Sequence, residues 1–180
     1  FVGTAVLTEL LQRGHRVTAL ARDPAKLPLR EGLTVVQANA TDAAQVAQAV
    51  RGVDAVASAY NPGWTHPDLH DEFLRGSRAI TAGVQLVDTP QFPAEWKNGA
   101  LAAREALNLL RQESTLQWTF LSPAILLEPG ERTGHYRLGT ESPLMNGDQP
   151  GKISVADLAV AIVDELEAPR HLQQRFTVAY

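Results

Sequence analysis

The 180-residue chain contains no cysteine, which excludes disulfide bonds, thiolate catalysis and cysteine-based metal sites. It has no apolar run long enough to cross a bilayer and no visible signal peptide, so a cytoplasmic location with no membrane partner is expected. Positive charge is not in excess, since 16 lysine and arginine residues face 20 acidic ones. This balance, without a basic stripe, argues against a nucleic-acid partner.

Segments of strand length alternate with segments of helical periodicity along this chain, which is 44% hydrophobic. The alternation predicts one α/β domain over residues 1–180, with a parallel sheet and helices on both faces. Gly14 should end the first helix, and Ser154 should cap the last one. The expected strands are 17–21, 33–37, 55–59 (buried on both faces), 84–88, 117–121, 136–138 and 176–180. The helices after the first are expected at 43–50, 68–82, 94–111 and between the cap Ser154 and residues 165–169.

Several motifs in order along the chain resemble the atypical short-chain dehydrogenase/reductases. The resemblance is to NAD(P)-binding proteins of the NADH-flavin-reductase-like, NAD-dependent epimerase/dehydratase-like and NmrA-like kinds. It implies a Rossmann-like, doubly wound parallel sheet with a small C-terminal extension on the substrate side, and a nucleotide at the carboxyl ends of the strands. The motifs are Phe1-Val2-Gly3, residues 14–20, Asp54-Ala55-Val56, Asn61-Pro62-Gly63-Trp64, residues 118–124, residues 128–134 and residues 153–157.

Relatives in this family carry two segments that this chain lacks. One is a first strand with a Gly-x-x-Gly-x-x-Gly turn, of which Gly3 would be the last glycine. The other is a helix end, a central strand and a turn between the equivalents of Ala82 and Gly83, on the order of two dozen residues. Because a parallel sheet without two inner strands could not close its core, we expect both segments to belong to the protein. The alternative is a naturally decayed domain.

The resemblance assigns the cofactor diphosphate to Phe1-Val2-Gly3, at the start of the first helix. Taken alone, Gly3 indicates only a helix start. Arg22 ends the strand 17–21, where NAD-preferring domains usually have an acidic residue. An arginine there suits the 2′-phosphate of NADP, and Lys26 could add charge. The alternative is a solvated turn arginine beside Asp23. NADP is therefore favoured, with NAD as the alternative cofactor.

Further cofactor contacts are expected at the ends of three strands. In relatives the position of Asn39 contacts adenine and Ala40 offers backbone contacts, although Asn39 is equally well a loop residue before a helix cap. Small residues in Ser58-Ala59-Tyr60 would let the cofactor pass. Tyr60 is the one catalytic candidate, but such a tyrosine more often packs against the next loop. The resemblance places Ser122-Pro123-Ala124 beside the nicotinamide ring, and its alternative is a plain strand end.

The Tyr-x-x-x-Lys pair of short-chain dehydrogenases does not occur in this sequence. That pair lets a phenol act as an acid or base, so its absence counts against carbonyl reduction. Trp96-Lys97 stands near the expected place, but an indole cannot transfer the proton. Related chains often carry a lysine four residues before a helical glutamate, and if Glu105 is that glutamate, Leu101 takes the lysine position.

Three residues are candidates for substrate contact. Trp64 could cover the substrate site, or it could simply shield the sheet edge. Arg132 and Tyr136, with Arg137 beside them, could meet an anionic substrate, although surface arginines are common.

His66 and His70 have the spacing of a metal-binding pair on a helix. However, Pro67 marks a helix start, and the aspartates at 68 and 71 suit its positive end. No metal site is therefore expected.

Three functions are compatible with these residues. The first is an NADP-dependent reductase of flavin-like or quinone-like acceptors, which need little help because hydride goes directly to a conjugated ring. The second is an NAD(P)-sensing regulator of the NmrA kind without turnover. The third is a nucleotide-sugar epimerase or dehydratase, which the missing Tyr/Lys pair disfavours. The substrate is expected to be a small molecule, and the sequence leaves the oligomeric state open.

Overall fold

The computed structural model describes residues 1–61 and 94–180, with side chains from residue 98 onward in the second range. The predicted helix 68–82 and strand 84–88, and the candidates Trp64, His66 and His70, lie outside the described residues. In chain order the elements are α1 (Val2–Gln12), β1 (Val17–Ala21), the 3-10 turn η1 (Pro24–Lys26), β2 (Leu33–Gln37), α2 (Ala43–Ala49), α4 (Ala94–Leu110), β3 (Thr119–Pro123), β4 (Leu126–Glu128), β5 (Arg137–Gly139), β6 (Met145–Asn146), β7 (Gln149–Pro150), β8 (Lys152–Ser154), α5 (Val155–Glu167) and β9 (Gln174–Ala179).

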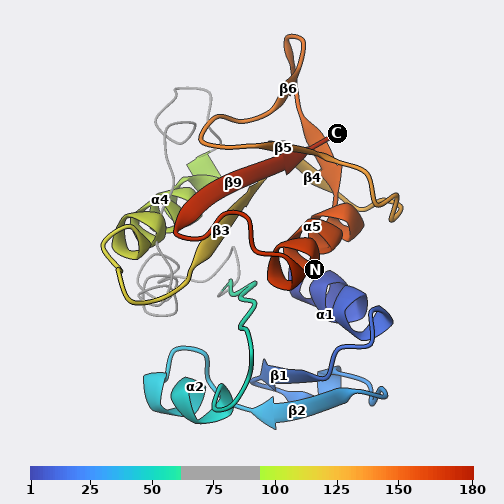
Figure 1. Cartoon of the computed structure of the whole chain (residues 1–180), viewed down its shortest axis with the longest axis vertical. Helices are drawn as coiled ribbons and strands as arrows, with labels where there is room; N and C mark the ends of the chain where they lie inside the picture. The colour runs from blue at the N-terminus through green and yellow to red at the C-terminus, as the bar shows by residue number, and fades with distance from the viewer. Residues whose placement is uncertain (62–93) are drawn as a thin grey trace.

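The N-terminal part of the chain is a helix followed by a parallel strand pair (Figure 1). Gly14 adopts a left-handed conformation at φ +84°, which ends α1 and turns the chain into β1 as predicted. β1 and β2 have the predicted bounds and pair from Val17 opposite Leu33 to Ala21 opposite Gln37. Their carboxyl ends therefore lie at the same edge.

The C-terminal part contains three small sheets. β3 and β9 are parallel, and β5 adds to β9 in the antiparallel sense. β4 pairs in parallel with β8, and β6 and β7 form a short hairpin whose turn includes Gly147 at φ +60°. The strand expected at 136–138 is present one residue later as β5.

Helices cover both faces of the sheet formed by β3 and β9. Phe120 packs against a cluster that contains Leu107 and Leu110 of α4. The next residue, Leu121, packs against a second cluster, which contains Leu158 of α5. Successive strand residues point to opposite faces, so α4 and α5 lie on opposite sides of this sheet, as predicted.

α1 packs along α5, and the two helices lie side by side in Figure 1. Val6 and Leu7 of α1 are buried, and α5 is buried along most of its length. The N-terminal and C-terminal parts of the described chain are therefore joined mainly through a helix pair.

The prediction for residues 55–59 was wrong in this structure. The segment belongs to no helix or strand, and its residues are exposed, with Val56 at 61%. A parallel strand needs hydrogen-bonded neighbours, and none of the described strands pairs with it. Small apolar residues indicate that a segment can be buried in a sheet, but its neighbours decide whether it is.

Within residues 1–61 and 94–180, no helix is both long and apolar enough to cross a membrane. No group of three or more histidine, aspartate or glutamate side chains in the same ranges could hold a metal ion.

Candidate functional site

The start of α1 lacks the side-chain acceptors that cap two other helices. Within the described residues its N-cap, Phe1, makes no side-chain cap hydrogen bond, and the first turn has no acidic residue. By contrast, Asp42 accepts hydrogen bonds from two first-turn amides of α2, and Ser154 accepts one from the amide of Asp157 in α5. The partial positive charge at the start of α1 therefore meets no acidic side chain from its own first turn, which suits binding of an anion such as a diphosphate.

Two segments that are distant in the sequence meet this helix start. A Cβ atom added at Gly3 would lie 3.6 Å from the Cβ atom of Ala59, so α1 approaches residues 58–60 closely. Val2 packs against the hydrophobic cluster that contains Ala124. The structure therefore places the helix start close to residues 58–60 and against the core cluster to which Ala124 belongs.

The carboxyl end of β1 carries an exposed arginine. Arg22 follows the strand, and its guanidinium makes no ion pair within the described part of the chain. Asp23 instead lies 3.5 Å from the ammonium of Lys26 and accepts a hydrogen bond from the amide of Ala25. The Arg22 carbonyl accepts a hydrogen bond from the side chain of Gln37. The turn is thus held by other groups, which leaves the Arg22 guanidinium available to an anion.

Asn39 shapes the loop between β2 and α2. Its Oδ1 accepts hydrogen bonds from the backbone amide and the hydroxyl of Thr41 at 3.0 and 2.9 Å. The backbone amide of Asn39 donates to Oε1 of Gln45. Asp42 is the N-cap of α2. The loop interpretation accounts for Oδ1 of Asn39, and contact of Asn39 and Ala40 with adenine stays a prediction.

Ser122 and Pro123 are the last residues of β3, which extends two residues beyond the predicted strand because they pair with Thr177 and Val178 of β9. The Ser122 hydroxyl accepts a hydrogen bond from Nε of Arg175 at 2.9 Å, and Ala124 is buried in the core. β9 and the core thus hold this segment at the carboxyl end of its strand. Tyr60, which follows residues 55–59, is half-buried.

The two described substrate candidates both make internal contacts. Arg132 binds Glu9 of α1, and the hydroxyl of Tyr136 donates to Asp164 of α5. Burial, together with this carboxylate, raises the pKa of Tyr136 above its usual range. Both side chains have partners that the sequence did not indicate, and their contact with a substrate stays a prediction.

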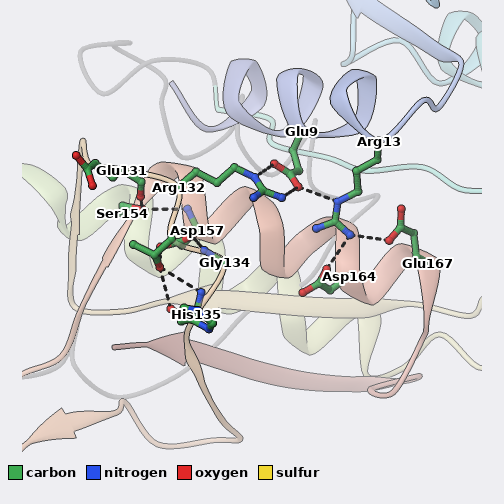
Figure 2. Close-up of polar contacts among 11 residues, drawn as sticks. Glu9, Arg13, Glu131, Arg132, Gly134, His135, Ser154, Asp157, Asp164 and Glu167 are labelled. Atoms are coloured by element: carbon green, nitrogen blue, oxygen red, sulfur yellow. Dashed lines mark hydrogen bonds and ion pairs between the residues drawn. The ribbon is translucent and has the colours of Figure 1, made fainter.

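A buried carboxylate lies in the middle of α1 (Figure 2). Glu9 is 3% exposed and accepts hydrogen bonds from Nε of Arg13 at 2.7 Å and from Nε and Nη2 of Arg132 at 2.6 and 2.7 Å. Arg13 also reaches Asp164 and Glu167 of α5 at 2.8 and 2.6 Å. The sequence analysis missed this site. The Glu9–Arg13 spacing of four residues was visible, but the Arg132 partner was not.

The contacts of Glu9 predict a dependence of stability on pH. The hydrogen bonds from Arg132, which outweigh burial, hold the pKa of Glu9 below its ordinary value of 4.5. Ionised Glu9 therefore stabilises the fold above about pH 4.5, and this contribution is lost as the pH falls through the lower, folded-state pKa. In chemical denaturation, the loss of unfolding free energy caused by Glu9→Gln should shrink between about pH 7 and about pH 3.5. A loss that does not change with pH would contradict the assignment.

A second buried carboxylate, Asp157, fastens the segment before β5 to the start of α5. It accepts hydrogen bonds from the Thr133 hydroxyl at 2.6 Å, the Gly134 amide at 2.7 Å and the Tyr180 hydroxyl at 2.7 Å. Burial raises the pKa of Asp157, but these donors outweigh it, so that the pKa lies below its usual range. The predicted cap is confirmed as well, since the Ser154 hydroxyl accepts a hydrogen bond from the Asp157 amide at 2.9 Å.

A family model described as NAD(P)H-binding matches residues 1–169. The chain belongs to this NAD(P)H-binding family. The chain is 34% identical to the uncharacterized protein YwnB of Bacillus subtilis over 201 aligned positions, which cover 98% of this chain and 92% of YwnB. Because the alignment is longer than the 180 residues of this chain, YwnB has residues without a counterpart here.

Two solved structures are similar over almost the whole chain of this NAD(P)H-binding protein. A candidate epimerase of Bacteroides thetaiotaomicron is 36% identical with a TM-score of 0.87, covering 99% of this chain and 92% of that one. A candidate NADH-flavin reductase of Streptococcus pneumoniae is 31% identical with a TM-score of 0.81, covering 99% and 93%. The resemblance to atypical short-chain dehydrogenase/reductases and the Rossmann-like α/β fold are thus confirmed.

Proposed function

We propose that the protein is an NADPH-dependent reductase that passes a hydride directly to a flavin-like or quinone-like ring. The observation that carries the proposal is the close approach of Gly3, in a first turn of α1 without acidic residues, to Ala59, in a member of the NAD(P)H-binding family. Such a helix start suits a cofactor diphosphate. The S. pneumoniae relative, named as a candidate NADH-flavin reductase, supports the choice of acceptor.

The residues that would hold the cofactor lie around this helix start and at the ends of the strands. The first-turn amides of α1 would bind the diphosphate, and the exposed Arg22 would bind the 2′-phosphate of NADP, with Lys26 nearby. Adenine would lie by Asn39 and Ala40. The nicotinamide ring would lie between Ser58-Ala59-Tyr60 and Ser122-Pro123-Ala124.

The chemistry asks little of the protein beyond placement. When bound, NADPH supplies a hydride from its nicotinamide ring, which with one proton from water converts an oxidised flavin or quinone into its reduced form and leaves NADP⁺. The ring accepts the electrons directly, so a Tyr/Lys acid–base pair is not required. This agrees with the absence of that pair from the sequence.

A sensor that binds NAD(P) without turnover is the second candidate. It is favoured because Arg132 and Tyr136, the two described substrate candidates, bind Glu9 and Asp164 within the protein, which suits a protein that has no substrate to hold. An epimerase, as the B. thetaiotaomicron relative is named, would need acid–base residues that the missing Tyr/Lys pair would have supplied.

NADPH oxidation in the presence of FMN, FAD and a simple quinone tests the proposal, with NADH as the comparison cofactor. We expect turnover with at least one acceptor and a preference for NADPH. Tight NADPH binding without oxidation would refute the reductase and favour the sensor. Failure to bind either nucleotide would refute both.

A further inference from the structure

We propose that Arg132, acting through Glu9, is a positioning residue that sets the distance between the cofactor helix α1 and the substrate-side segment 129–135. The inference rests on the proposed function, because it assumes that α1 holds the cofactor. Neither residue is expected to contact the reacting atoms. Glu9 lies seven residues after Val2, which places it about 10 Å along α1 from the helix start.

The segment 129–135 contacts the start of α5 through groups other than Arg132. The carbonyl of Glu131 accepts a hydrogen bond from the Ser154 hydroxyl at 2.8 Å, while the hydroxyl of Thr133 and the amide of Gly134 donate to Asp157. A Cβ atom at Gly130 would lie only 2.9 Å from Cβ of Ser154, so the backbone lies directly against the helix start. The side chain of Arg132 instead points away from α5 and binds Glu9 of α1 (Figure 2).

α1 is likewise held on α5 without Arg132. Arg13 binds Glu9 in its own helix and both Asp164 and Glu167 in α5. α1 and the segment 129–135 thus each contact α5 separately, and the Glu9–Arg132 pair is the ion pair that joins them to each other directly. What it adds is a fixed separation between α1 and the segment 129–135.

The chemistry of the pair suits such a role. Glu9 lies on the buried face of α1, one helical repeat after Val2 and Val6. An apolar side chain at this position would pack without the free-energy cost of removing a carboxylate from water. The two parallel hydrogen bonds from Nε and Nη2 of Arg132 fix direction as well as distance, which a lysine ammonium cannot do. Because small misplacements between reacting groups slow a reaction strongly, the pair would act on hydride transfer and not on cofactor affinity.

The test compares Arg132→Lys, which keeps the charge and loses the paired hydrogen bonds, with the control Arg13→Lys, which weakens the other partner of Glu9. NADPH affinity, kcat with FMN and the isotope effect of NADPH deuterated at C4 are measured for each variant. Hydrogen exchange of the peptide over residues 129–135 is followed with NADPH bound, which reports on the segment without any turnover.

For Arg132→Lys we expect an NADPH Kd within about threefold of the unmodified protein, a kcat lowered about 10-fold or more, a larger isotope effect and exchange in 129–135 several-fold faster. Arg13→Lys, which keeps a positive charge facing Glu9, Asp164 and Glu167, should lower kcat and speed exchange in 129–135 clearly less than Arg132→Lys does. Unchanged kcat and exchange in Arg132→Lys, a parallel loss of NADPH affinity, or equal effects of Arg13→Lys would overturn the inference. An unmodified protein that binds no NADPH would defeat the proposed function itself. If the unmodified protein binds NADPH but reduces no acceptor, the inference is judged by hydrogen exchange alone: faster exchange of residues 129–135 in Arg132→Lys supports it, and unchanged exchange overturns it.

Discussion

Replacing Arg22 with aspartate is expected to weaken NADPH binding about 10- to 100-fold while changing NADH binding much less. The exposed guanidinium at the end of β1 has no ion-pair partner within the described ranges, so its charge is available to the 2′-phosphate. A hydrogen bond to a charged group contributes about 1.5–3 kcal/mol, and about 1.4 kcal/mol corresponds to a tenfold change in Kd. NADH lacks the 2′-phosphate and so lacks this contact. Fluorescence titration with both nucleotides measures the two affinities.

Arg16→Asp is the matched control for this experiment. Arg16 is also exposed, and it precedes β1, at the edge of the strand pair opposite to Arg22. The same change of charge there should leave the ratio of the two affinities near that of the unmodified protein. Equal losses for NADPH and NADH in Arg22→Asp would remove Arg22 from the 2′-phosphate site and leave the choice of cofactor open.

Replacing Asp157 with alanine is expected to cause the largest loss of stability among single substitutions at the sites described, about 3 kcal/mol. Asp157 is fully buried, and its removal leaves the Thr133 and Tyr180 hydroxyls and the Gly134 amide without their acceptor. When buried donors lose a charged acceptor, the free energy of unfolding falls more than when the same groups lose it at the surface. Chemical denaturation at neutral pH measures the free energy of unfolding.

Two further variants show whether burial and charge cause this loss. Asp148→Ala removes an exposed aspartate from the turn between β6 and β7 and should be nearly neutral. Asp157→Asn keeps the shape and one acceptor oxygen, so its loss should lie between the other two. An Asp157→Ala protein within about 1 kcal/mol of the unmodified one would show that water replaces the carboxylate, and that the segment 129–135 does not depend on it.

Local patterns predicted most of the elements because their causes are local. Short runs of mostly apolar residues define β1 and β2, Gly14 permits the left-handed turn after α1, and the Ser154 hydroxyl caps α5 from within four residues. The strand at 55–59 failed for the opposite reason. Its residue types suit a buried strand, but burial and pairing depend on neighbours that lie elsewhere in the chain.

The residues of the candidate site also differ in whether local or distant parts of the chain determine them. Gly3 and Arg22 could be proposed from the sequence, Gly3 through the family resemblance and Arg22 because it ends a strand, and their cofactor contacts stay predictions. Glu9 and Asp157 were not, since their partners Arg132, Thr133 and Tyr180 lie 23 to 123 residues away. An isolated glutamate in an amphipathic helix is usually a surface residue, and only the packing of α1 on α5 makes it a buried one.

The sequence by itself determined the α/β order, the helix caps, the absence of thiol chemistry and the family resemblance, because each depends on residue types and short spacings. Only the tertiary structure decided that Glu9 and Asp157 are buried and that Arg132 joins α1 to the segment 129–135. The physical reason is that ion pairs and burial are set by distances between side chains, and the chain brings remote residues together only when its helices and sheets pack.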